Sequence, residues 1–111
     1  MVARKDSETE VTIEEFDEII NNSHKLVVVD FFAEWCMPCL MLAPIVEELA
    51  EQMPDVKFVK LNVDDNQELS SKYKVSSIPC LIIFKSGKEA DRIIGAHSGD
   101  VIEEKIKKYL E

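Results

Sequence analysis

The sequence has few cysteines and no long apolar run. Three cysteines among 111 residues are an odd number and too few for the disulfide framework of small secreted domains. The most apolar runs, residues 26–32 and 79–84, are far shorter than the roughly 18 residues that a transmembrane helix needs. Residues 1–10 contain no apolar stretch of the signal-peptide type. We therefore expect a protein of a reducing compartment, the cytoplasm, with no membrane partner.

Basic residues are also in short supply. Lysine and arginine number 13 against 22 aspartate and glutamate residues, which gives a net charge of -9 and a pI near 4.7. Such a balance repels phosphate backbones, so nucleic acid is not an expected partner. With 46% hydrophobic residues, the chain is long and apolar enough for a core of its own. We expect a monomer with one domain over residues 1–111, in which residues 1–9 form a loose leader.

The spacing of apolar residues predicts alternating helices and strands. A capping box of Thr12 and Glu15 marks the start of the first helix. Nearly continuous β-branched runs predict buried strands, whereas repeats at three and four residues predict helices. The expected elements are an edge strand near 10–11, a helix from 13 that ends where Asn21-Asn22 breaks the pattern, a strand at 26–32, a helix at 38–53, a strand at 56–63, a short helix at 67–73, a strand at 78–84, a turn at 85–88, a strand through 92–94 and a last helix capped by Ser98. The apolar face of that last helix is predicted to contain Val101, Ile102, Ile106, Tyr109 and Leu110.

The order of these elements predicts the sheet. Strands joined through helices are expected to run parallel, and the two strands beside the turn at 85–88 antiparallel. The fold class is therefore α/β, with a central mixed sheet of four to five strands flanked by helices on both faces.

Cys36 and Cys39 lie where a buried strand gives way to a helix. The first N–H groups of a helix lack internal partners and carry partial positive charge, which lowers the pKa of a thiol there below its ordinary value of about 8.5. A spacing of three residues places both sulfurs on one face of the first turn, close enough to bond. We expect Cys36, at the exposed leading edge, to attack a target disulfide, and Cys39, one turn deeper, to resolve the mixed disulfide.

Asp30 interrupts an apolar strand just before the cysteines. Burying a carboxyl group in such a strand costs folding free energy, so we infer that Asp30 has a function there. Burial also raises the pKa of the carboxyl group. It could then accept the proton of Cys39, directly or through a water. The other interpretation is a buried polar residue that is merely hydrogen-bonded.

The whole segment resembles the active site of the thioredoxin family. The run Asp-Phe-Phe-Ala-Glu-Trp-Cys-Met-Pro-Cys at 30–39 carries the resemblance. Further similar motifs are Pro44, Lys60 within 59–64, Ile78-Pro79, Phe84-Lys85-Ser86-Gly87 and Gly95-Ala96, spread over roughly residues 10 to 110.

The resemblance implies the thioredoxin fold and a redox activity. Cys36 would be the nucleophile, Cys39 the resolving thiol, Asp30 the buried acid–base and Lys60 the cation near it. Trp35, Met37, Pro38, Ile78 and Pro79 would contact the substrate, with Trp35 as an aromatic wall. Pro79 would be cis and face the cysteines, and the backbone of Ile78 would pair with the substrate. The implied activity is reduction of protein disulfides, with electrons from a reductase of the thioredoxin-reductase type and no bound cofactor or metal.

Three residues depart from the family pattern. Met37 stands in place of the usual glycine, and Leu40 in place of the usual lysine, which leaves the redox potential open. Cys80 stands where threonine is common, so it is either a third redox thiol or a small buried hydrophobe. Met37 and Met41 could extend an apolar docking surface, or Met41 could belong to the core.

Three alternatives to a reductase stay open on the sequence. A disulfide oxidase or isomerase would follow from a raised potential. A binding module with the same fold would not turn its thiols over. A zinc site at the cysteine pair would need about four ligands, and only Cys80, His24 and His97 remain to supply them.

Overall fold

The computed structural model describes residues 9–110, which form five strands and four helices. In chain order the elements are β1 (Thr9–Glu10), α1 (Ile13–Asn22), β2 (Leu26–Phe32), α2 (Met37–Gln52), β3 (Val56–Asn62), α3 (Gln67–Lys72), β4 (Cys80–Lys85), β5 (Lys88–Ile94) and α4 (Gly99–Lys107). The order predicted from the sequence is confirmed. The expected leader, residues 1–9, falls outside the described residues apart from Thr9, which begins β1. No helix within residues 9–110 is long and apolar enough to cross a bilayer.

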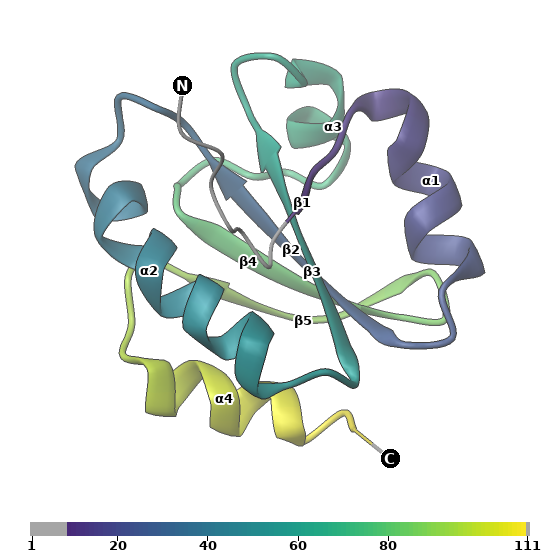
Figure 1. Cartoon of the computed structure of the whole chain (residues 1–111). Coiled ribbons are helices and arrows are strands. Elements are labelled where there is room, and N and C mark those ends of the chain that lie inside the picture. The colour runs from purple at the N-terminus through teal and green to yellow at the C-terminus, as the bar shows by residue number, and fades with distance from the viewer. Residues whose placement is uncertain (1–8, 111) are drawn as a thin grey trace, which may run out of the picture.

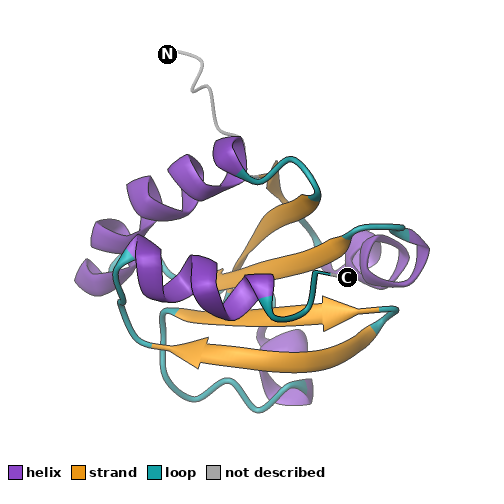
Figure 2. Cartoon of the chain, turned by 90° about the horizontal axis from the view of Figure 1, so that it is seen from below, coloured by secondary structure: helices purple, strands orange, loops and turns teal. Residues whose placement is uncertain are grey.

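The strands form one mixed sheet in the order β1-β3-β2-β4-β5. Strand β2 is central, parallel to β3 on one side and antiparallel to β4 on the other. Helices α1 and α3 cover one face of this sheet, and α2 and α4 cover the other (Figure 1, Figure 2). The predicted α/β sheet with helices on both faces is therefore confirmed.

The direction of β4 corrects the expectation that strands joined through a helix run parallel. Strand β4 follows α3 and yet runs antiparallel to β2. Helix α3 lies in this connection but does not carry the chain back to the starting edge of the sheet, because Cys80, the first residue of β4, pairs with Phe31 near the end of β2. Strand β4 therefore begins at the edge where β2 and β3 end, and it runs back antiparallel to them.

Alternation along β2 divides the core into two clusters. Val28 packs on the side of α2 and α4, against Leu42 and Ile102 among others. Val27 and Val29 pack on the opposite side, with Phe16 of α1. Because β2 is buried on both faces, the point where it ends is held rigidly within the sheet.

Two details at the carboxyl-terminal end differ from the expected pattern. Strand β5 begins at Lys88 because the turn consists of Ser86 and Gly87 alone, both with positive φ (54° and 82°), as in a tight two-residue hairpin. Val101 is exposed instead of buried, since it lies about 100° around α4 from Ile102, which faces the core.

Candidate active site

The cysteine pair lies where β2 passes into α2. Cys36 is the N-cap residue of α2, and its Sγ accepts a hydrogen bond of 3.2 Å from the backbone N–H of Cys39. The first turn of the helix contains no acidic residue. One free N–H of the helix end is therefore already directed at the sulfur, and no nearby carboxylate of that turn opposes a negative charge on it.

Cys36 and Cys39 are joined in a disulfide. Their Cα atoms lie 5.2 Å apart, within the range of about 4.4–6.8 Å that disulfides usually span. The spacing of three residues on one helical turn thus allows the bond. The geometric expectation from the sequence is met by the structure.

Cys36 is less accessible than its predicted position at an exposed edge. Both cysteines are only 5% exposed. They cluster with Ala33, and Phe32, Val63 and Ile78 pack against the three. The Sγ of Cys36 lies 3.9 Å from the carbonyl oxygen of Ile78. Side chains and backbone from two loops therefore enclose the sulfur, which the sequence pattern alone does not reveal.

The loop that contacts Cys36 contains a cis peptide bond between Ile78 and Pro79, as the family resemblance implies. The carbonyl of Pro79 accepts a hydrogen bond of 2.8 Å from the N–H of Gly95, at the end of β5. Pro79 is buried and Ile78 is half-buried. The hydrogen bond from Gly95 thus anchors this loop to the end of β5, and Ile78 lies next to the disulfide. Contact of Ile78 and Pro79 with a substrate stays a prediction.

Asp30 is buried in the middle of the sheet, two residues after Val28 on the face of β2 that α2 covers. In the paired strands β2 and β3, Asp30 lies directly beside Lys60. The Nζ of Lys60 lies 5.6 Å from the centroid of the Phe32 ring, a cation–π distance. The structure therefore brings Asp30 and Lys60 together as neighbours, on the helix-α2 side of the sheet. Their roles in proton transfer stay predictions.

Trp35 is exposed beside the disulfide and is held by a residue that the sequence analysis missed. Its indole N–H donates a hydrogen bond of 2.8 Å to Oδ2 of Asp64. The side chain of buried Asn62 in turn accepts a hydrogen bond of 2.9 Å from the N–H of Asp64. A usable signal existed, because β2 and β3 were expected to be parallel, and polar residues at their carboxyl ends meet at one edge of the sheet.

The remaining predicted contact residues are accessible. Met37 and Pro38, between the cysteines, are exposed, and so is Met41, which therefore does not belong to the core. Met37 and Pro38 form the start of α2, where the missing N–H of a proline costs no helical hydrogen bond.

Cys80 lies in the core on the side of the sheet that α1 and α3 cover. It packs in the cluster with Phe16 and Ile82 on the α1 and α3 side of the sheet, not in the cluster of Cys36 and Cys39. Burial raises the pKa of the Cys80 thiol, and the nearby guanidinium of Arg92 only partly opposes this effect. A buried, protonated thiol is a poor nucleophile. We therefore favour the buried-hydrophobe interpretation over a third redox thiol.

Alkylation should separate these roles of Cys80. When the reduced native protein is treated with iodoacetamide, we expect modification of Cys36 and protection of Cys80 until the protein is denatured. Peptide mass spectrometry would measure both sites. Rapid labelling of native Cys80 would contradict the assignment. Replacing Cys80 with Ala should leave disulfide turnover unchanged.

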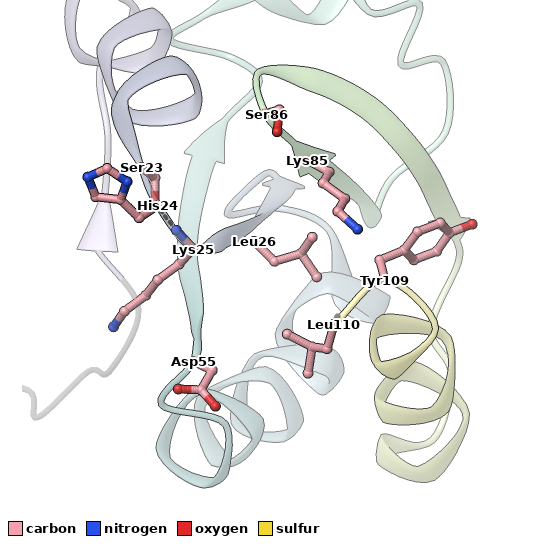
Figure 3. Close-up of a pocket in the computed structure, with 9 residues that line it drawn as sticks. All are labelled: Ser23, His24, Lys25, Leu26, Asp55, Lys85, Ser86, Tyr109 and Leu110. Atoms are coloured by element: carbon pink, nitrogen blue, oxygen red, sulfur yellow. Dashed lines mark hydrogen bonds between the residues drawn. The ribbon is translucent and has the colours of Figure 1, made fainter.

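A pocket of about 500 Å³ opens at the opposite end of the sheet (Figure 3). Residues at the start of β2 and at the β4–β5 turn line it together with Tyr109 and Leu110. It contains no cysteine and is remote from the start of α2. Across the described part of the chain, no three His, Cys, Asp or Glu side chains are grouped so that they could hold a metal ion.

Comparison with known proteins agrees with this geometry. Residues 7–108 match the family model described as Thioredoxin. A thioredoxin of Chlamydia pneumoniae is 46% identical over 99 residues, which cover 89% of this chain and 95% of that protein. Thioredoxin-2 of Saccharomyces cerevisiae is 51% identical over 83 residues, covering 75% and 80% of the two chains.

Solved structures give the same result. A mutant thioredoxin from Halobacterium salinarum superimposes with a TM-score of 0.87 at 36% identity, covering 99% of this chain and 97% of that one. The sequence relatives and the structural neighbour thus agree on the same family and fold. The chain belongs to the thioredoxin family and is a dithiol–disulfide oxidoreductase.

Proposed function

We propose that this protein reduces disulfides of target proteins through Cys36 as nucleophile and Cys39 as resolving thiol. The Cys36 thiolate attacks one sulfur of the target disulfide, which breaks that bond, forms a mixed disulfide and releases the other target sulfur as a thiolate. The Cys39 thiolate then attacks Cys36, closes the disulfide between them and releases the second target thiol. The target gains two electrons, and a separate reductase returns two electrons to the cysteine pair.

One observation carries the proposal. The Cys36 sulfur lies at the start of α2, accepts the N–H of Cys39 and is bonded to the Cys39 sulfur. The same place therefore favours a thiolate on Cys36 when the pair is reduced and allows ring closure when it is oxidised.

We assign the proton chemistry to Asp30. The resolving step needs Cys39 as a thiolate, and Cys39 is buried, so water has little access to its proton. Asp30, on the face of the sheet beneath α2, is the acceptor in this scheme, and Lys60 beside it stabilises the carboxylate. Trp35, Met37, Pro38, Ile78 and Pro79 would form the substrate contact surface around the disulfide.

The cellular setting is also part of the proposal. Family membership implies protein disulfides as substrates and a reductase as partner. We place the protein in the cytoplasm, as a monomer with one domain and no bound cofactor, on the basis of its composition and cysteine count. Relatives occur in other compartments too, since an M-type thioredoxin of Pisum sativum that is 42% identical over 96 residues is chloroplastic.

A disulfide oxidase or isomerase is the second candidate function, and it depends on the residues beside the cysteines. Such residues tune how readily the pair is reduced: Met37 stands in place of the usual glycine, whereas Leu40 removes the charge that a lysine would place near the thiols, which by itself favours the disulfide. A raised potential would make the protein an oxidase or isomerase.

Equilibration with glutathione tests the direction of the reaction. A reductase pair has a lower potential than an isomerase pair, so we expect the Cys36–Cys39 disulfide to stay mostly oxidised in a glutathione buffer poised at about −230 mV, between the two. The parent protein should also reduce insulin when supplied with a stronger dithiol. Alkylation followed by mass spectrometry would report the oxidised fraction. A pair that glutathione reduces almost fully would favour the oxidase or isomerase, and a pair that reduces no protein disulfide would favour a binding module.

A further inference from the structure

One face of α2 points to solvent along its whole length. Six residues at helical spacing lie on it and are all exposed: Met37, Leu40, Met41, Pro44, Glu48 and Glu51. At about 100° per residue they fall within one sector of the helix. We call this set the α2 stripe. It begins immediately after Cys36 and leads away from the disulfide.

The first part of the α2 stripe is apolar. Met37, Leu40 and Met41 are 65%, 53% and 66% exposed. Large apolar side chains grouped on a surface commonly mark an interaction site. Methionine adapts its shape to varied partners, which suits a surface that meets more than one protein. None of these three side chains belongs to a core cluster or is among the residues packed against one.

The second part of the α2 stripe is acidic, and no cation balances it from the helix. Glu48 and Glu51 are exposed. Residues 26–56 contain no lysine or arginine, and the last turn of α2 has no basic residue, although the end of a helix favours cations. The stripe thus combines an apolar half beside the disulfide with a negative half farther from it.

The dimensions of the helix set where a partner would meet each half. At 1.5 Å per residue, Leu40 and Met41 lie about 6–8 Å along the axis from Cys36, and Glu48 and Glu51 about 18–23 Å. An extended chain covers about 3.3 Å per residue. A target whose cysteine is bonded to Cys36 would reach the apolar half two or three residues away and the acidic half about five to seven residues away.

We propose that the α2 stripe docks the segment of a target protein beside its reactive cysteine. That segment has a large apolar residue two or three positions from the cysteine and lysine or arginine about five to seven positions from it. The proposal rests on the proposed function. It goes further because it names a sequence class of target and adds Leu40, Met41, Glu48 and Glu51 to the contact surface. Two observations favour a target segment here. The stripe begins beside Cys36, where the target is bonded, and its two glutamates would attract a basic residue of the target.

Matched disulfide peptides test the proposal. One peptide carries Leu at the third position and Lys at the fifth to seventh positions from its cysteine, and the other carries Gln and Glu there. A small aromatic disulfide, Ellman's reagent, serves as a substrate that lacks both the apolar and the basic residues of the proposed segment. Quenched-flow chromatography gives the second-order rates. We expect the parent to prefer the apolar–basic peptide by about tenfold or more.

Variants assign this preference to its two halves. The double variant Leu40→Gln, Met41→Gln should lower the ratio of the apolar–basic peptide rate to the Ellman's reagent rate about tenfold. The double variant Glu48→Gln, Glu51→Gln should remove most of the salt dependence of the peptide rate, because screening acts on that charge pair. Val101→Gln is the matched control: Val101 is 48% exposed on α4, outside the stripe, and its change should leave the ratio as it is.

Equal rates for the two peptides would overturn the inference. So would a ratio of peptide rate to Ellman's reagent rate that stays the same when Leu40 and Met41 are replaced. Self-association of the parent that those replacements abolish would show instead that the stripe is an interface between copies of this chain. Failure of the parent with Ellman's reagent as well as both peptides would instead contradict the proposed function.

Discussion

Replacing Cys36 with Ser should abolish the reduction of insulin, leaving only the rate of the added dithiol. A hydroxyl cannot form the mixed disulfide, and it is not ionised at neutral pH even at a helix N-terminus. We expect no substitution by Cys80, because it is buried in a different core cluster and burial raises the pKa of its thiol. Turbidity of the precipitating insulin chain gives the rate, and circular dichroism checks that the variant is folded.

The matched control is Cys39→Ser. It should also lose turnover, but it should keep the first step and accumulate a mixed disulfide between Cys36 and the target. Nonreducing electrophoresis detects that adduct, and its release by dithiothreitol confirms the bond. A mixed disulfide formed by Cys36→Ser, or undiminished turnover in either variant, would contradict the roles of Cys36 as nucleophile and Cys39 as resolving thiol.

Replacing Asp30 with Asn should slow the resolving step at pH 7 about hundredfold, the low end of what a positioned proton acceptor contributes. Asparagine keeps the size of the side chain but cannot take the Cys39 proton. The deficit should shrink as pH rises, because hydroxide then removes that proton without help. Decay of the mixed disulfide, followed by rapid quench between pH 6 and 10, would measure it.

Asp55→Asn provides the control for this change in charge. Asp55 is exposed just before β3, at the far end of the sheet from the cysteines. Its replacement should leave the resolving rate unchanged at every pH. If Asp30→Asn showed the same flat profile as Asp55→Asn, or slowed the reaction equally at all pH values, Asp30 would be a structural residue and not the proton acceptor.

Local patterns predicted the elements well because each of them depends on neighbours in sequence. The capping box at Thr12 is present, with the Thr12 N–H donating a hydrogen bond of 3.0 Å to Glu15. The side chain of Ser98 caps α4 as expected. The β-branched run at 26–32 is the central strand with unchanged bounds. Periodicity and capping are read within a few residues, so one sequence suffices for them.

Contacts between distant segments could not be obtained in this way. The burial of Cys36 depends on Val63 and Ile78, and the position of Trp35 depends on Asp64, 29 residues away. The direction of β4 depends on the edge at which the chain re-enters the sheet, since Cys80 pairs with Phe31 near the end of β2. Each of these is set by how strands and loops that are distant in sequence pack together, which periodicity and capping within a few residues do not specify.

By itself, the sequence determined the chemistry: two cysteines three residues apart at a helix start, an acid in an apolar strand, and the identities that resemble a known family. Only the tertiary structure decided access and support, namely that Ile78 shields Cys36, that Asp64 holds Trp35, and that Cys80 belongs to the other face of the sheet. The reason is physical. Reactivity follows from atom types and their local backbone, whereas exposure follows from packing between segments that are distant along the chain.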